Sequence, residues 1–259
     1  MGSYEKVLIT GASSGIGRAM ALWWARRGAT VWATARRTKN LDELAAQGEG
    51  RIKPVAMDVA KEAETVAQIQ AIDAECGGLD LVIANAGVGG ATPAGRTDWA
   101  ALEPVFRTNV TGAIATISAV LPRMVQRGHG HVAGISSLVA WNPYGANSAY
   151  CASKACLSMF LDCVALDLHG SKVKVTCIEP GFVVSEMTDR TRGKVPMPFI
   201  ASTEAAADRY GRAILRGQQK IAWPTVHAFG SLLLKLMPGP LYRAVTGGAA
   251  RAQVKDLPQ

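Results

Sequence analysis

The stretch TGASSGIG, residues 10–17, decides the fold of this chain. It follows KVLIT (6–10), a short apolar run typical of a buried β-strand, and it leads into a helical stretch. Gly11 can adopt turn conformations closed to other residues, Gly15 leaves room for a pyrophosphate, and Gly17 lets the helix pack closely on the sheet. The free N–H groups at such a helix start favour phosphate. The stretch therefore predicts a dinucleotide-binding turn.

Short runs rich in apolar and β-branched residues alternate with helical stretches along the rest of the chain. The further expected strands are TVWATA (30–35), IKPVAM (52–57), LDLVIA (79–84), HVAGIS (131–136) and KVTCIE (174–179). The expected helices lie near 15–27, 61–76, 98–127 and 147–169. This alternation predicts an α/β fold in which helices cover both faces of a parallel sheet, and ligands then bind at the carboxyl ends of the strands.

The composition limits the class of protein. The chain has 259 residues and is 49% hydrophobic, which suits one domain over residues 1–259. It has no run of eighteen or more apolar residues, and MGSYEKVLITG lacks a signal-peptide pattern, so we expect a cytoplasmic protein. The five cysteines form no C-x-x-C pair and do not join the four histidines at zinc-ligand spacing. We expect no metal site, and we expect the cysteines to be buried and reduced.

Basic residues exceed acidic ones, 28 to 20, which gives a net charge of +8 and suits nucleic acid, an anionic membrane or an anionic ligand. The longest basic cluster is ARRTKN, and no aromatic-interleaved basic stripe follows it, so no nucleic-acid partner is expected. At the end of this strand an NAD site usually has an acid, but here Ala35 is followed by Arg36 and Arg37. Guanidinium pairs bidentately with phosphate, so we expect NADP(H), contacted mainly by Arg36.

The motif YCASK (150–154) places Tyr150 and Lys154 four residues apart, on one face of a helix. Hydride transfer between an alcohol and nicotinamide needs a group that exchanges a proton with the alcohol oxygen. A lysine ammonium about 4 Å from a tyrosine supplies about 4 kcal/mol, enough to lower the tyrosine pKa from about 10 by about two to three units. Ser137, at the end of the fifth expected strand, can orient the substrate oxygen.

These motifs fall in a familiar order. TGASSGIG, NAG (85–87), ISS ending at Ser137, YCASK and PG (180–181) have the order and the intervals of the short-chain dehydrogenase/reductases, which the chain resembles over roughly residues 4–185. The resemblance implies a Rossmann-like, doubly wound parallel sheet of about seven strands in a single domain. It also implies an enzyme that acts on CH–OH and C=O groups.

The resemblance assigns roles to individual positions. The catalytic residues that it implies are Asn109, Ser137, Tyr150 and Lys154, with Asn109 in a water-linked proton relay to Lys154. The residues expected at the cofactor, Asp58 at the adenine among them, are Gly11, Ser13, Ser14, Gly15, Ile16, Gly17, Arg36, Arg37, Asp58, Val59, Asn85, Ala86, Gly87, Tyr150, Lys154, Pro180, Gly181, Val183 and Ser185. Ser185 stands where the family more often has threonine, a change that keeps the hydroxyl.

Substrate specificity is expected to come from the segment after Gly181. FVVSEMTDRTRGKVPMPFI mixes charged residues with Gly and Pro, which predicts a mobile lid over residues 181–202. The residues expected to contact the substrate are Ser137, Leu138, Trp141, Tyr144, Phe182 and Met187, with Met197 and Phe199 as further candidates. Their apolar character predicts a hydrophobic secondary alcohol or ketone.

The C-terminal segment, residues 223–259, follows an expected helix and a short strand, KIAW. Its run FGSLLLKLMPGPLYRAV combines apolar bulk with Lys235 and Arg243 and is too short to span a bilayer. It suits three roles: covering the substrate pocket, pairing subunits, or peripheral contact with a membrane surface. We prefer subunit pairing, because the family resembled is commonly dimeric or tetrameric, so a homodimer or homotetramer is expected.

The leading hypothesis is an NADP(H)-dependent oxidoreductase acting on a hydrophobic secondary alcohol or its ketone. One alternative is an NAD-dependent alcohol dehydrogenase of the same family, and another is a dinucleotide-sensing protein without turnover. The presence of Asn109, Ser137, Tyr150 and Lys154 together favours an enzyme, because a sensor has no need of all four.

Overall fold

The computed structural model describes residues 4–189 and 197–255, and within them one seven-stranded sheet forms the centre of the molecule. Its strands are β1 (Lys6–Thr10), β2 (Thr30–Ala35), β3 (Ile52–Ala56), β4 (Leu81–Ala84), β5 (Gly130–Ile135), β6 (Val173–Pro180) and β7 (Lys220–Trp223). The spatial order is β3-β2-β1-β4-β5-β6-β7, and every neighbouring pair is parallel. The predicted doubly wound parallel sheet is confirmed, and its order reverses between β1 and β4, where such sheets bind ligands.

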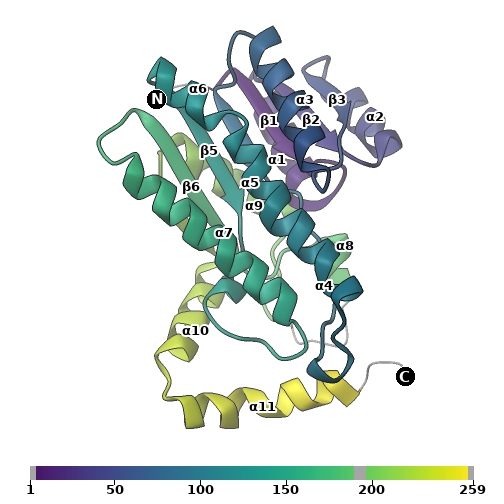
Figure 1. The fold of residues 1–259 in the computed structure, drawn as a ribbon, viewed down its shortest axis with the longest axis vertical. Helices are drawn as coiled ribbons and strands as arrows, with labels where there is room; N and C mark the ends of the chain where they lie inside the picture. The colour runs from purple at the N-terminus through teal and green to yellow at the C-terminus, as the bar shows by residue number, and fades with distance from the viewer. Residues whose placement is uncertain (1–3, 190–196, 256–259) are drawn as a thin grey trace.

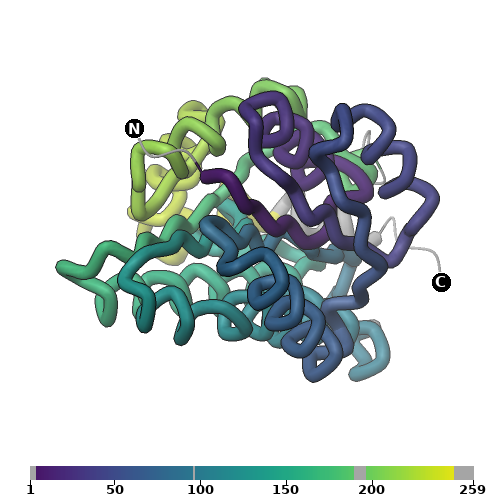
Figure 2. The backbone as a smooth tube through the Cα atoms, turned by 90° about the horizontal axis from the view of Figure 1, so that it is seen from above, coloured from purple at the N-terminus to yellow at the C-terminus, as the bar shows by residue number. Residues whose placement is uncertain are grey.

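Helices cover both faces of this sheet (Figures 1 and 2). They are α1 (Gly15–Ala25), α2 (Thr38–Ala46), α3 (Glu62–Glu75), α4 (Trp99–Phe106), α5 (Ala113–Ser118), α6 (Leu121–Arg127), α7 (Ser148–Asp167), α8 (Glu186–Asp189), α9 (Thr203–Leu215), α10 (Thr225–Leu236) and α11 (Gly239–Lys255). Residues of α1, α2 and α9 form one hydrophobic cluster with the sheet, and residues of α3, α5, α6 and α7 form the other. The sheet thus divides the hydrophobic core into two clusters.

The strands are apolar on both faces because both faces are covered. In β1, Val7 and Ile9 belong to one cluster, whereas Leu8, between them, belongs to the other. All three side chains are fully buried. Burying one such side chain stabilises a fold by about 1.5–3 kcal/mol, so an uninterrupted apolar run specifies a central strand.

The stretch 98–127, expected as helical throughout, is divided into shorter elements. A π-helical turn, Arg107–Gly112, follows α4, and α5 ends at Ser118 before α6 begins at Leu121. Pro122 lies in the first turn of α6, and its missing N–H explains why the preceding helix cannot continue through it. The π turn was not predicted, and such turns often mark functional sites.

Helix α7 satisfies the length and composition of a membrane-crossing helix, yet it packs in the core. Leu157 and Leu161 are each 1% exposed against the sheet. On its other face, Cys156 and Cys163 are exposed. The expectation that the cysteines are buried is wrong for these two, because their positions on α7 face away from the sheet; Cys177, in β6, is buried, and all five thiols are free.

Helices α10 and α11 lie beyond the sheet at one end of the molecule (Figure 1). Asn142 Nδ2 donates to Ser231 O at 2.8 Å, and the Tyr242 hydroxyl donates to Pro143 O, which attach both helices to the segment before α7. Large apolar side chains of these helices are 44–72% exposed, namely Val226, Phe229, Leu232, Leu233, Leu236, Leu241 and Val245. We call these seven residues the C-terminal apolar face. Their role, whether covering the substrate pocket, pairing subunits or touching a membrane, stays a prediction.

Candidate active site

The glycine turn and the segment after β4 interlock at the carboxyl ends of their strands. Gly11 has φ +68, and a Cβ on it would lie 2.6 Å from Ala86 Cα, while a Cβ on Gly17 would lie 2.3 Å from Asn85 Nδ2. Asn85 Nδ2 donates to Thr10 O at 2.9 Å and to Gly11 O at 3.1 Å. Both glycines are therefore required for packing, and together they hold the turn open at the start of α1, where a phosphate binds.

The other predicted cofactor positions lie near this turn or on the segment after β6. Gly15 has φ +56, and a Cβ on it would lie 3.5 Å from Ser185 Cβ, so the start of the predicted lid lies against the turn. Val183 is 3% exposed and Val59 is 6% exposed. The remaining members of this group are Ile16 at the start of α1, Pro180 at the end of β6, and Gly181 directly after it.

Arg37, rather than Arg36, reaches the glycine turn. Its Nη2 donates to Ser13 Oγ at 3.0 Å and to Ser14 Oγ at 2.8 Å, whereas Arg36 is exposed beside it. A guanidinium and two hydroxyls on one loop are a donor set that suits a phosphate. These residues fit the 2′-phosphate of NADP(H). Arg36 and Arg37 are both exposed, and the contact expected between Arg36 and the phosphate stays a prediction.

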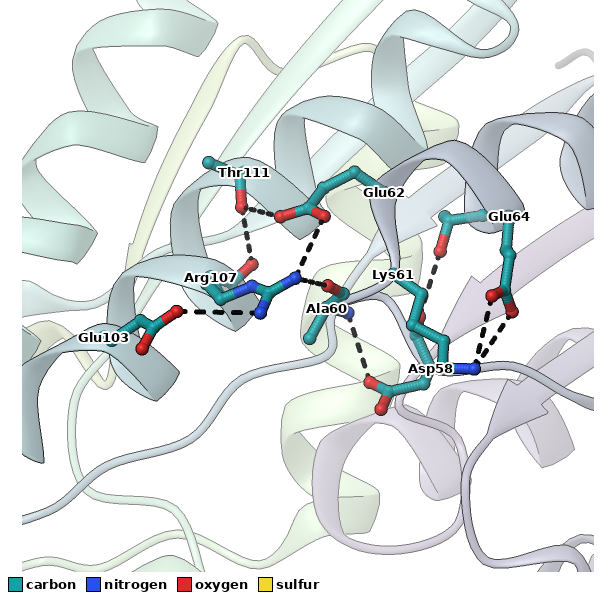
Figure 3. A network of polar contacts seen from close by, with 9 residues as sticks. Asp58, Ala60, Lys61, Glu62, Glu64, Glu103, Arg107 and Thr111 are labelled. Atoms are coloured by element: carbon teal, nitrogen blue, oxygen red, sulfur yellow. Dashed lines mark hydrogen bonds and ion pairs between the residues drawn. The ribbon is translucent and has the colours of Figure 1, made fainter. Parts of the chain in front are cut away.

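The loop that carries Asp58 is fixed to the π turn by a polar network (Figure 3). Asp58 Oδ1 accepts from Ala60 N at 3.1 Å, and Arg107 Nη2 donates to Ala60 O at 2.9 Å. Glu62 accepts from Thr111 Oγ1 at 2.6 Å and lies 3.6 Å from Arg107. The hydrogen bond from Thr111 lowers the pKa of Glu62, which keeps its carboxylate ionised. The network positions Asp58 relative to the turn that carries Asn109.

Asn109 is fully buried in the π turn, and its side chain is fully engaged. Oδ1 accepts from Val88 N at 2.8 Å, and Nδ2 donates to Val88 O at 2.9 Å and to Ser153 Oγ at 3.0 Å. A Cβ on Gly87 would lie 3.3 Å from both Asn109 Oδ1 and Lys154 Nζ. Asn109 therefore lies close to Lys154, and its amide holds the segment after β4 in place. The water-linked relay stays a prediction.

Tyr150, Lys154 and Ser137 meet at the carboxyl end of β5. Lys154 is 3% exposed, its Nζ donates to Ile135 O at 2.8 Å, and it lies 5.8 Å from the centroid of the Tyr150 ring. The Ser137 hydroxyl forms a hydrogen bond with Tyr150. The predicted helix of YCASK is confirmed, with Tyr150 and Lys154 one turn apart. The structure thus places the four expected catalytic side chains close together: Ser137 is paired with Tyr150, Lys154 lies one helical turn away, and Asn109 is near Lys154.

Burial controls both titrating groups in the free protein. It raises the pKa of Tyr150 to about 12, against the opposing effect of the Ser137 hydrogen bond, and it lowers the pKa of Lys154 to about 8. Tyr150 keeps some accessible surface, so a substrate can reach it. The expected lowering of the tyrosine pKa is wrong for the free protein, because burial disfavours the charged phenolate and the Ser137 hydrogen bond offsets this only in part. Tyr150 is a neutral phenol that can donate a proton.

The residues expected around the substrate lie on two sides of this group. Leu138 is 4% exposed, and Trp141 N donates to Leu138 O at 3.1 Å. Tyr144 is 38% exposed and lies near Ser231 of α10. The contact of Trp141 and Tyr144 with a substrate stays a prediction.

On the lid side, Met187 reaches the segment after β4. Its Sδ lies 3.2 Å from the position of a Cβ on Gly89. The Phe182 ring packs edge-on against His227 at 5.3 Å. Phe199, one of the further candidates, is 73% exposed, so it does not line an enclosed site. The middle of the predicted lid, residues 190–196, lies outside the described residues.

His227 was not singled out in the sequence, yet it joins both described parts of the lid. Its Nδ1 accepts from Phe182 N at 3.3 Å, and its Nε2 donates to Pro198 O at 2.7 Å. A Cβ on Gly181 would lie 2.4 Å from His227 Nδ1, so this glycine permits the contact. Nothing in the sequence signals the pairing, because Phe182 and His227 are far apart in the chain and meet only in the folded protein.

Two acidic residues were also missed. Glu179 is 1% exposed, its Oε1 accepts from Ser158 Oγ at 3.0 Å, and burial raises its pKa. Glu186, in α8, forms an ion pair with Arg37. In the part of the chain that the structure describes, no group of three or more His, Cys, Asp or Glu residues is placed to hold a metal ion.

The arrangement agrees with known proteins. The family model for short chain dehydrogenases matches residues 5–195. An uncharacterized oxidoreductase from Myxococcus xanthus (strain DK1622) is 48% identical over 245 residues, which are 93% of this chain and 96% of that protein. The NADP-dependent 3-hydroxy acid dehydrogenase YdfG from Shigella flexneri is 35% identical over 178 residues, 68% of this chain and 72% of that protein.

A solved structure supports the same assignment over almost the whole chain. The short-chain dehydrogenase from Sphingobium yanoikuyae, in complex with NADPH, has a TM-score of 0.78 and 27% identity and covers 98% of this chain and 97% of that chain. The match therefore includes the C-terminal helices, where the sequence resemblance had weakened. With its sheet order, glycine turn and Ser137–Tyr150–Lys154 group, this chain belongs to the short-chain dehydrogenase/reductase family of oxidoreductases.

Proposed function

We propose that the protein is an NADP(H)-dependent oxidoreductase that interconverts a hydrophobic secondary alcohol and its ketone. The observation that carries the proposal is the grouping of Ser137, Tyr150 and Lys154 near the end of β5, where the carboxyl ends of the parallel strands meet. A nicotinamide bound here supplies or accepts the hydride.

The cofactor is assigned from the donors on the turn. Arg37, Ser13 and Ser14 suit a 2′-phosphate, which NADP(H) has and NAD(H) lacks. The relative YdfG is named as NADP-dependent, and the similar solved structure holds NADPH, which supports this choice.

The chain's own residues handle the proton. Tyr150, a neutral phenol with a pKa of about 12, donates to the oxygen of a ketone as the alcohol forms. Ser137 donates a hydrogen bond to the same oxygen and orients it. Lys154, held by Ile135 O, returns a proton toward Tyr150. Asn109 holds the backbone of Val88, and the neighbouring Gly87 lies against Lys154.

The substrate is proposed to be hydrophobic because Leu138, Phe182 and Met187 approach the site from two sides. The relative's printed substrate is a 3-hydroxy acid, which carries a carboxylate as well as an alcohol. The two classes differ in charge, so a substrate panel separates them.

For assembly, we propose a homo-oligomer whose contacts include the C-terminal apolar face. Exposed apolar patches of this kind mark contacts with a protein or a membrane. Subunit pairing stays the preferred role, and membrane contact is its alternative.

The test is a panel of hydrophobic ketones, secondary alcohols and 3-hydroxy acids with NADP(H) and NAD(H), followed by the absorbance of the reduced nicotinamide. We expect turnover of hydrophobic ketones, with kcat/KM at least about tenfold higher for NADPH than for NADH, because charge-assisted bonds to the 2′-phosphate are lost with NADH. Cofactor binding without turnover of any compound would support the sensor instead, and a preference for NADH would support the NAD-dependent alternative.

A further inference from the structure

Glu186 occupies the side of the Arg37 guanidinium that faces the lid. Arg37 Nη1 lies 2.9 Å from both Glu186 Oε1 and Glu186 Oε2, while its Nη2 contacts Ser13 and Ser14. The arginine and glutamate side chains are 47% and 50% exposed. A carboxylate of the lid thus shares one guanidinium with the hydroxyls of the glycine turn.

The pair joins segments that are far apart in the chain. Arg37 directly precedes α2, and Glu186 begins α8 directly after Ser185. A Cβ on Gly15 would lie 3.5 Å from Ser185 Cβ, so the backbone before Glu186 already lies against the glycine turn. This contact places the Glu186 carboxylate beside Arg37, one of the donors that suit a 2′-phosphate.

We propose that Glu186 is a specificity-determining residue, which holds the Arg37 guanidinium in the free protein and is displaced by the 2′-phosphate of NADP(H). The inference rests on the assignment of Arg37, Ser13 and Ser14 to that phosphate. Its consequence is that binding of a 2′-phosphorylated ligand, and not of NAD(H), releases α8 from the glycine turn.

The charges of the two anions explain why the 2′-phosphate displaces the Glu186 carboxylate from Arg37. A phosphate dianion beside Arg37 repels a carboxylate that lies within the same guanidinium's reach, so the two anions compete. An ion pair between half-exposed groups is weak, and the phosphate gains Ser13 and Ser14 as additional donors, so the phosphate wins. The 2′-hydroxyl of NAD(H) is neutral and leaves the pair intact.

Displacement also acts on the lid. Within α8 the Asp189 N–H donates to Ser185 O at 2.9 Å, and Ser185 N donates to Thr188 Oγ1 at 2.8 Å. Arg37 is an anchor that ties this short helix to α2 from outside. Removing the anchor separates the start of α8 from the glycine turn.

The test uses two probes that differ only in the phosphate, 2′,5′-ADP and 5′-AMP, titrated calorimetrically into the full-length protein. Wild type is compared with Glu186→Gln, Arg37→Gln and the double variant. We expect Glu186→Gln to bind 2′,5′-ADP about threefold to tenfold more tightly, and 5′-AMP within about twofold of wild type. In the Arg37→Gln background the same glutamate substitution has no effect on either probe.

Asp208→Asn is the matched control. Asp208, in α9, forms an ion pair with Arg212 at 2.8 Å, and the two side chains are 45% and 56% exposed, so the substitution removes one negative charge from a similar pair away from the glycine turn. Its affinity for 2′,5′-ADP should equal that of wild type. If Glu186→Gln and Asp208→Asn tighten binding equally, the effect is one of net charge, and the proposal fails.

Unchanged or weaker binding of 2′,5′-ADP by Glu186→Gln also overturns the proposal, and it leaves the NADP(H) assignment standing as long as wild type prefers 2′,5′-ADP to 5′-AMP. Equal binding of the two probes by wild type refutes the phosphate site and the inference together. Hydrogen exchange in wild type needs no variant: 2′,5′-ADP should accelerate exchange of the Asp189 amide, and 5′-AMP should not. Equal exchange with both probes contradicts the release of α8.

Discussion

The catalytic group and the C-terminal apolar face are built in opposite ways. At the carboxyl end of β5, polar side chains are buried and partnered: Asn109, Ser137 and Lys154 are 0%, 8% and 3% exposed. On α10, apolar side chains are exposed, with Phe229 at 63% and Leu236 at 72%. The first region is completed by its own chain and a small ligand. The second presents apolar surface that only another surface can cover.

The difference sets what a substitution does in each region. A buried polar group that loses its partner costs about 1–3 kcal/mol, and a buried apolar group that is truncated leaves a cavity. An exposed apolar side chain has little to lose within the chain itself. Substitutions therefore test whether the two regions differ as the structure indicates.

The largest effect is expected for Tyr150→Phe. Loss of the hydroxyl removes the proton donor and its hydrogen bond to Ser137, so kcat should fall by about 10³-fold. The ring remains, and cofactor affinity should change less than about threefold, since the phosphate donors are untouched. Steady-state rates and cofactor titration measure the two quantities. Activity within a few-fold of wild type would show that another group carries the proton.

A paired truncation compares packing directly. Leu161→Ala, at a side chain that is 1% exposed in the core cluster of α7, should lower the free energy of unfolding by about 2–5 kcal/mol. Leu236→Ala, at 72% exposure on α10, should change it by less than about 0.5 kcal/mol in the monomer. Urea denaturation at low protein concentration measures both. A large loss at Leu236 that grows with protein concentration would instead show that the face is covered by a second copy.

The stability of the buried core should also depend on pH, because the core contains His131. His131 is fully buried in β5, between the Tyr4 hydroxyl at 2.7 Å and Thr176 Oγ1 at 2.8 Å, and burial lowers its pKa to about 3. Between that value and the ordinary pKa of about 6.5, the unfolded state binds more protons than the folded state, so stability falls as the pH falls.

From pH 6.5 to pH 5 this residue should remove about 2 kcal/mol of unfolding free energy. The measurement is urea denaturation at both pH values, with His131→Gln as the comparison. The variant should lose less stability over this range than wild type does. Equal losses in the two proteins would mean that carboxylates, rather than His131, control the response to acid.

The sequence predicted the elements that local patterns specify. Short patterns specify most of the fold, because each depends on a few neighbouring residues. The apolar runs and the glycine turn predict the sheet and its binding edge, and YCASK predicts that Tyr150 and Lys154 lie one helical turn apart. The contacts of Arg37 with Ser14 and Glu186 depend on how separate loops meet, which short-range spacing does not encode. His227 was missed for the same reason.

The pKa of Tyr150 shows a different limit. The spacing of Tyr150 and Lys154 predicts an attraction that lowers the pKa of the tyrosine. The spacing does not reveal how much water is excluded from the phenol. In the structure, burial has the largest effect on the pKa of Tyr150 and raises it in the free protein. Lys154 is likewise shifted by burial, and its contact with Ile135 O was not visible in the motif.

The π turn at Arg107–Gly112 makes the protein sensitive to a deletion of residues between α4 and α5. A π turn holds one more residue than a regular helical turn, and each residue of a helix accounts for about 100° of rotation. A single-residue deletion within this turn would restore ordinary helical geometry and move Asn109 out of its place in the π turn, which breaks its hydrogen bonds to Val88. The number of residues between α4 and α5 therefore matters for the hydrogen bonds of Asn109.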